Sequence, residues 1–250
     1  MLALGWLATS CSSGNNEVEE VAKVGSGTIA LTVAAEDAFA NGARAVDETP
    51  YKNVDNYTVQ ILQGDTKVKE FKYGEKADTY ELSNGNYTLV AFYGTESICS
   101  RTGFYVTGSS AFSINGNTQN VTVSCAPTCG RMAVNFDTKM ADYFENYYVA
   151  YETAAIKEAG ASAVWGKDDT DPWYLRLNAA GEVVKATVNY TLKSTGKTYQ
   201  ILKEYAMKPN QAWTLNVVPN VIEGKLILTI TIDESTDDKP IDIEVPSDWI

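Results

Sequence analysis

The chain has 250 residues, of which 44% are hydrophobic and 11% aromatic, and this composition is typical of globular, β-rich proteins rather than disordered ones. Acidic residues (32) outnumber basic residues (20), and the resulting net charge of −12 argues against nucleic acid or an anionic membrane surface as a partner. Histidine is absent, which removes the commonest general base and metal ligand, so we expect neither a metal site nor a cofactor.

The first eleven residues resemble a bacterial lipoprotein signal. Residues 1–7 form an apolar run too short to span a bilayer, and small residues directly precede Cys11, although no Lys or Arg comes before the run. A polar, acidic stretch over residues 12–26 then reads as a flexible tether. In this interpretation Cys11 is acylated and anchors the protein. The alternative is a buried apolar segment with an incidental cysteine.

Three further cysteines, Cys99, Cys125 and Cys129, would lie in an exported chain, where an oxidising compartment permits one disulfide. Loop-closure entropy favours a bond from Cys99, at about 3.5 kcal/mol, over the small Cys125–Cys129 loop, at about 2 kcal/mol. The partner of Cys99 stays open, and three unpaired buried thiols are the alternative. Without histidine, these cysteines make no convincing zinc site.

Residues 27–125 predict a first β-sandwich domain. The strongest strand signal is residues 87–93, which follow the turn residues Asn84 and Gly85 and carry apolar side chains on both faces. We therefore expect a central strand, with a long loop over residues 36–54 elsewhere in the domain. Other strands are expected near residues 28–34, 56–62, 67–73, 79–82, 103–106, 111–114 and 119–125. The predicted core includes Leu31, Val33, Val59, Ile61, Leu89, Ala91, Val121 and Val123.

Pro127 and Gly130 mark the expected junction, and residues 130–250 predict a second domain. One or two helical turns are expected within residues 137–144. Strands are expected near residues 131–136, 147–151, 173–177, 183–192, 198–205, 213–218, 225–232 and 241–245. The predicted fold class is therefore all-β, with two antiparallel β-sandwich domains in tandem.

The densest carboxylate cluster, residues 168–171, lies between Trp165 and Trp173. Carboxylates could hold Ca²⁺ there, and exposed indoles of Trp165, Trp173 and Trp213 could stack on a sugar. The cluster lacks the spacing of a calcium loop, so a solvated loop is the simpler interpretation. The sequence has no nucleophile elbow or phosphate-binding loop, and a catalytic triad would lack its histidine, so we expect no enzyme.

Several segments, in their order along the chain, resemble two-domain Bacteroidales lipoproteins of unknown function that are related to fimbrillin-like pilus and adhesion proteins. They are the lipobox at Cys11 and residues 27–33, 85–91, 121–125, 134–137 and 243–250. The resemblance implies transthyretin-like or immunoglobulin-like sandwiches, a lipid anchor in the outer membrane, exposure at the cell surface, and a structural or adhesive role as a pilus subunit or accessory protein. Other pilus subunits and host or glycan ligands are the implied partners. The alternative function is a surface glycan-binding lipoprotein that uses exposed Trp and Tyr side chains.

The resemblance also implies a processing site at Arg44-Ala45. In fimbrillin-like subunits, assembly is thought to follow cleavage after an Arg in the loop behind the first strand, so that a segment of another subunit replaces that strand. The apolar alternation of residues 226–232 or 241–245 could supply such a segment. An ordinary surface loop with one incidental arginine is the alternative.

Overall fold

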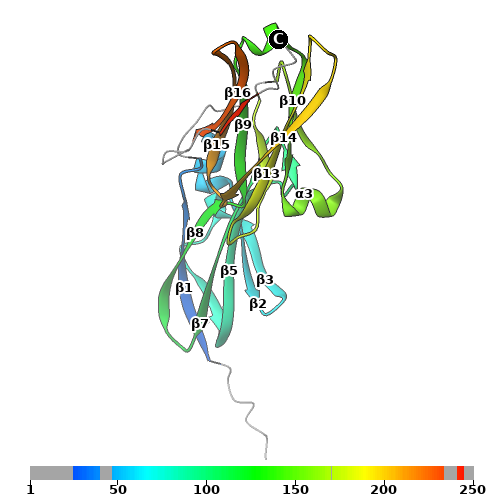
Figure 1. The fold of residues 1–250 in the computed structure, drawn as a ribbon. Helices are drawn as coiled ribbons and strands as arrows, with labels where there is room; N and C mark the ends of the chain where they lie inside the picture. Colours follow the sequence, from blue (N-terminus) through cyan, green and yellow to red (C-terminus); the bar gives the residue numbers. More distant parts are fainter. Residues whose placement is uncertain (1–24, 40–46, 170, 234–240, 245–250) are drawn as a thin grey trace, which may run out of the picture.

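The computed structural model describes residues 25–39, 47–169, 171–233 and 241–244, which form an elongated, almost entirely β-structured body (Figure 1). Helical segments in this part of the chain are short: α1 (Thr49–Lys52), η1 (Val54–Asn56), η2 (Tyr73–Glu75), α2 (Met140–Tyr143) and α3 (Ala154–Ala159). None of the helices described is long and apolar enough to cross a bilayer. The predicted all-β class is confirmed.

Seven strands build the first half of the molecule, in the spatial order β3-β2-β5-β7-β8-β1-β4. They are β1 (Ser26–Ala35), β2 (Thr58–Gln63), β3 (Thr66–Lys72), β4 (Tyr80–Ser83), β5 (Gly85–Gly94), β7 (Tyr105–Ile114) and β8 (Thr118–Pro127). The predicted central strand is β5, which pairs with β2 on one side and β7 on the other. Its Tyr87, Leu89 and Ala91 are buried, whereas Thr88, Val90 and Phe92 on the opposite face are only half-buried. The core therefore covers one face of this strand rather than both.

Strand β8 links the two layers of this half. Its residues 118–125 pair with β1, and its last two residues, Ala126 and Pro127, pair with Thr107 and Val106 of β7. A strand that changes sheets in this way makes the corner of a sandwich. All eight predicted core residues are buried between the layers.

Two strand pairs are parallel, whereas the sequence predicted antiparallel sandwiches without any parallel pair being anticipated. Strand β1 runs parallel to β8, and β9 (Cys129–Phe136) runs parallel to β15 (Ala212–Ile222). In both cases the two partners are far apart in the sequence, and the strands between them form the crossover that parallel pairing requires. Apolar alternation places side chains on a face but does not encode the direction of a distant partner.

Two sheets build the second half, with the orders β11-β10-β13-β14 and β17-β16-β15-β9-β12-β6. The remaining strands are β6 (Cys99–Ser100), β10 (Phe144–Glu152), β11 (Ala163–Gly166), β12 (Trp173–Arg176), β13 (Glu182–Leu192), β14 (Thr198–Met207), β16 (Lys225–Asp233) and β17 (Ile241–Glu244). Strands β6 and β11 and helix α3 were not predicted from the sequence. Helix α3 does carry end signals: the Thr153 side chain accepts a hydrogen bond from Ile156 N, and Gly160 closes the helix with a φ of 61°.

The buried side chains fall into two clusters that interlock at their shared boundary. The first draws on residues 29–125 and also includes Cys129 and Tyr174, and the second draws on residues 132–232. Strand β6 comes from the first half of the chain yet pairs with β12 in a sheet of the second half. One residue, Thr128, separates β8 from β9. The chain therefore passes from one core to the other without a linker.

The two clusters give a direct stability test. Leu89 is fully buried on β5, whereas Leu202 on β14 is 55% exposed. We expect Leu89→Ala to lower the free energy of unfolding by about 2 to 5 kcal/mol, because a cavity remains in a packed core. The matched Leu202→Ala control should change it by less than about 0.5 kcal/mol. Urea denaturation followed by tryptophan fluorescence measures both, and equal effects would contradict the packing described.

Candidate functional site at the junction of the two cores

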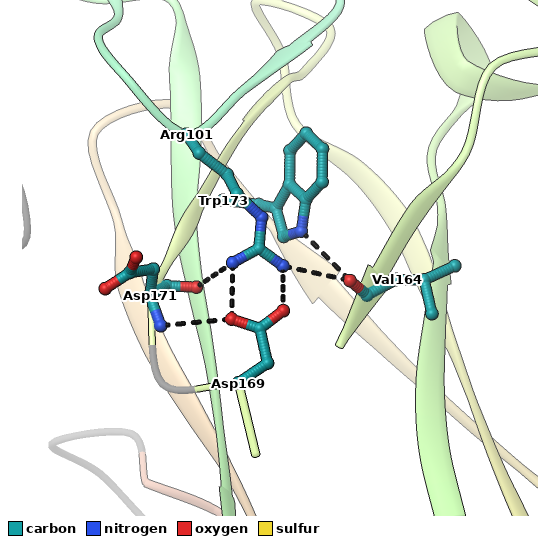
Figure 2. A network of polar contacts seen from close by, with 5 residues as sticks. All are labelled: Arg101, Val164, Asp169, Asp171 and Trp173. Atoms are coloured by element: carbon teal, nitrogen blue, oxygen red, sulfur yellow. Dashed lines mark hydrogen bonds and ion pairs between the residues drawn. The ribbon is translucent and has the colours of Figure 1, made fainter. Parts of the chain in front are cut away.

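Arg101 joins the two halves of the molecule through a network of polar contacts (Figure 2). It lies in the connection from β6 to β7, and its guanidinium binds both carboxylate oxygens of Asp169 in the connection from β11 to β12. The Nη1–Oδ1 distance is 2.6 Å, and Nη2 contacts Oδ2. The same two nitrogens donate to the carbonyl oxygens of Asp171, at 3.1 Å, and Val164, at 2.9 Å. Such a two-pronged arrangement fixes the orientation of the arginine as well as its position.

Two indole rings complete the surroundings of Arg101. Its guanidinium carbon lies 4.6 Å from the ring centre of Trp173 and 5.5 Å from that of Trp165. Trp173 Nε1 donates to the Val164 carbonyl oxygen that also accepts from Arg101. Because the Arg101 and Asp169 side chains are only 25% and 30% exposed, solvent screens their attraction less than it would at an open surface. We call Arg101, Asp169, Trp165 and Trp173 the Arg101 clamp.

The glycan-binding alternative would need Trp165, Trp173 or Trp213 to be exposed for sugar stacking, and two of the three are buried. Trp165 is fully buried against Tyr151, with ring centres 5.1 Å apart, and Trp213 is 7% exposed and packs on Tyr205 at 4.8 Å. Both lie at inward positions of their strands, so neither offers an open ring face. Trp173 is half-buried beside Arg101. The sequence signal of aromatics beside carboxylates thus marked a structural clamp rather than an open platform.

The carboxylate cluster at residues 168–171 also contributes to the Arg101 clamp. Asp169 is the partner of Arg101, and among the residues described no group of three His, Cys, Asp or Glu side chains is placed to hold a metal ion. Arg101 was not predicted from the sequence, because nothing near it in the chain signals a partner almost seventy residues away.

A buried ion pair forms a second connection between the halves. Glu48, which precedes α1, faces Arg131 of β9 with an N–O distance of 3.6 Å, and both side chains are at most 3% exposed. The guanidinium carbon of Arg131 also lies 5.6 Å from the ring centre of Phe39. Removing one member of such a pair strands the other charge in the interior, which typically costs about 3 to 5 kcal/mol. This pair, too, has no local sequence signal.

Aromatic rings pack around this ion pair. Phe104 contacts three of them: Tyr51 stacks on it at 3.8 Å, Tyr174 lies 5.0 Å away, and Phe39 meets it edge-on at 5.0 Å. Tyr174 comes from β12, whereas the other rings come from the first half of the chain. Aromatic pairs of this geometry stabilise by about 0.5 to 1.5 kcal/mol beyond the area they bury.

Asn210 fixes the segment that follows β1. Its side-chain Oδ1 accepts from Phe39 N at 3.1 Å, and its Nδ2 donates to the Asp37 carbonyl oxygen at 3.2 Å. Together with Glu48, these contacts tie both flanks of residues 40–46 to the second half of the molecule. The predicted processing residues Arg44 and Ala45, and the predicted lipidation residue Cys11, lie outside the described residues.

Cys99, Cys125 and Cys129 are free thiols, so of the two alternatives that the sequence left open the structure has the unpaired one, with Cys125 and Cys129 buried and Cys99 half-buried. Leu175 of β12 pairs with Cys99 on one side and Gly130 on the other, so β6 and β9 are two strand spacings apart, about 9.6 Å, which is too far for a bond between Cys99 and Cys129. Burial raises the pKa of the Cys125 thiol to about 11 and that of Cys129 to about 12, so both stay protonated at neutral pH.

A groove of about 450 Å³ opens where the two halves meet, and we call it the junction groove. Its walls come from β7, the end of β8, the end of β12 and the segments beside them. The lining residues are Glu96, Tyr105, Thr107, Ala126, Pro127, Thr128, Arg176, Leu177, Asn178, Ala179 and Pro209. This groove was not predicted from the sequence, because its residues come from five separate stretches of the chain.

Comparisons with known proteins connect the chain to one family. Residues 25–247 match the family model described as a domain of unknown function, DUF4493. No curated protein matches the chain. The predicted resemblance to proteins of unknown function agrees with this match.

Several solved structures are similar in part. A putative adhesin from Bacteroides ovatus is 10% identical, with a TM-score of 0.46, over 87% of this chain and 96% of its own. A structure from Bacteroides thetaiotaomicron, described as putative polysaccharide binding proteins, is 12% identical, with a TM-score of 0.43, over 89% and 99%. The fimbrial anchor protein Mfa2 from Porphyromonas gingivalis is 10% identical, with a TM-score of 0.43, over 83% and 97%. TM-scores this low support no inference about the function of this chain.

The Arg101 clamp can be tested with a double-mutant cycle. We expect Arg101→Ala and Asp169→Ala each to lower the free energy of unfolding. The coupling energy between them should be about 1 to 2 kcal/mol, because either substitution alone already breaks the two-pronged contact. The Lys185–Glu204 pair is a matched control, since its side chains are 43% and 48% exposed, and its coupling should be below about 0.5 kcal/mol. Chemical denaturation supplies the energies, and additive single effects at Arg101 and Asp169 would contradict the clamp.

Proposed function

The chain belongs to the DUF4493 family, and we propose that this member is a structural and adhesive protein of the cell surface, anchored to the outer membrane through lipid at Cys11. The observation that carries the proposal is the shape of the molecule. Strand β1 starts at one end of the elongated body, and the turns that join β15 to β16 and β13 to β14 lie at the opposite end (Figure 1). A tether ahead of β1 would hold this opposite tip away from the membrane.

The contacts between the halves suit such a role. The Arg101 clamp, the Glu48–Arg131 pair and Asn210 connect the two cores at separate points of the chain. Domains that share only a small, polar interface usually move relative to each other. Buried and aromatic contacts at this junction oppose such motion, so the body would act as a stiff spacer that presents its tip to other surface components.

Within this role, the placement of β1 favours an accessory protein over a strand-exchanging pilus subunit. Strand β1 lies between β8 and β4, and its Ile29, Leu31 and Val33 are buried in the first core. Cutting the chain after Arg44 would remove none of these contacts. Because several buried hydrophobic side chains, eight residue pairs with β8 and four residue pairs with β4 would have to be released together, we expect the cut strand to remain bound.

The anchor is tested in the native host. We expect Cys11→Ser to move the protein from the outer-membrane fraction to the soluble fraction, because a serine hydroxyl cannot take the thioether-linked lipid. Ser12→Ala is the matched control and should stay in the membrane fraction. Fractionation and immunoblotting read the result, and membrane retention of the Cys11→Ser variant would refute the anchor.

Processing is tested on the purified protein with an Arg-specific protease. We expect cleavage after Arg44 to give two fragments on a denaturing gel that still elute together as one monomer in size-exclusion chromatography, because β1 keeps its place in the sheet. Arg44→Lys is the control that should resist this cut. Ladders or fibres after cleavage would instead favour the strand-exchanging subunit.

A further inference from the structure

We propose that the junction groove binds a neutral saccharide. In this groove an aromatic ring, small apolar side chains and a charged rim from both halves line a single depression. Its volume of about 450 Å³ lies within the range of small-molecule sites, which occur preferentially where two packed units meet. This site goes beyond the structural role proposed above.

The floor of the groove supplies a flat apolar surface. Tyr105 is half-buried there, and Ala126 and Pro127 line the neighbouring strand. The residue directly across the strand pair from Tyr105 is Gly94, which has no side chain, and the β5 ring beside Tyr105 is that of Phe92, whose centre lies 6.0 Å away at an interplanar angle of 40°. Gly94 has a φ of 86°, and a Cβ there would lie 2.0 Å from the Phe104 carbonyl oxygen, so this position cannot take a larger residue without rearrangement. Aromatic rings of this kind stack on the C–H face of a sugar ring.

The rim supplies donors and acceptors for hydroxyl groups. Arg176 Nη1 lies 3.2 Å from Glu96 Oε1, and both side chains are about half exposed, so each keeps hydrogen-bonding atoms available. Asn178 is exposed beside them and adds an amide. Together they offer the alternating donors and acceptors that a row of sugar hydroxyls can meet.

Charge favours a neutral ligand over an anionic one. The positive charge of Arg176 is balanced by Glu96, and the chain as a whole carries a net charge of −12. An acidic ligand would therefore meet no uncompensated cation in the groove and an unfavourable field around it. A purely hydrophobic ligand would have to desolvate the ion pair at the rim, which costs free energy without a replacement.

The proposal is tested by titrating the full chain carrying Cys11→Ser with maltohexaose, cellohexaose, xylohexaose and mannohexaose in isothermal calorimetry. We expect at least one of these probes to bind. Tyr105→Ala should weaken that binding about tenfold or more, because the stacking face is lost, whereas Tyr105→Phe should retain it. Glu96→Gln and Arg176→Gln should each weaken it several-fold.

Tyr148→Ala is the matched control, since Tyr148 is a half-buried tyrosine on β10 outside the groove, and its affinity should equal that of the parent chain. Circular dichroism verifies that each variant is folded. Binding of none of the four probes by the parent chain overturns the proposal, and so does binding that Tyr105→Ala leaves unchanged.

Discussion

The structure depends on how closely two hydrophobic cores are joined, because only Thr128 separates β8 of the first from β9 of the second. The backbone of this residue is held on both sides. Its N–H and its hydroxyl donate to the Tyr105 carbonyl oxygen at 3.0 and 3.3 Å, and its own carbonyl oxygen accepts from Leu177 N at 3.3 Å. With so short a connection, the strand direction set in one sheet determines where the next sheet begins, and every other contact at the junction follows from that placement.

Because the two cores lie so close together, polar groups become buried where the cores meet. Glu48 and Arg131 are removed from water as a pair, and Tyr174 adds a buried hydroxyl whose pKa burial raises to about 12. Replacing such a pair with apolar residues is often neutral for stability, so its value lies more in fixing one arrangement of the two halves than in added free energy. The aromatic rings around it serve the same end, because each contact has a preferred geometry and excludes slippage between the cores.

Much of the fold could be predicted from the sequence, because alternation is a local signal. Leu31, Val33, Leu89 and Val121 were placed in the core by their spacing alone, and all are buried. The parallel pairing of β1 with β8 could not be predicted in this way, since a pattern within one strand is the same for either direction of its partner.

The candidate site was harder to predict for a related reason. Arg101 and Asp169 meet only because β6 joins a sheet of the second half, and no residue near either one signals the other. The burial of Trp165, which the glycan-binding alternative would have needed exposed, could not be predicted either, because it depends on the sheet that packs over the ring. Tyr105 and Arg176 line the same groove because the chain passes between the two halves at Thr128. The sequence predicted a junction there, but not a groove.

The parallel pairs also bear on how the protein reaches its native state. Residue 28 finds its partner at residue 118, and residue 131 finds its partner at residue 212, so each half closes only when its last strands are available. Chains dominated by such distant pairings fold slowly, because the entropy of a long loop is lost before the contacts are gained. Until β8 is available, β1 can pair only with β4, so one edge of this apolar strand stays open, and protection from aggregation during that interval becomes a requirement of this topology.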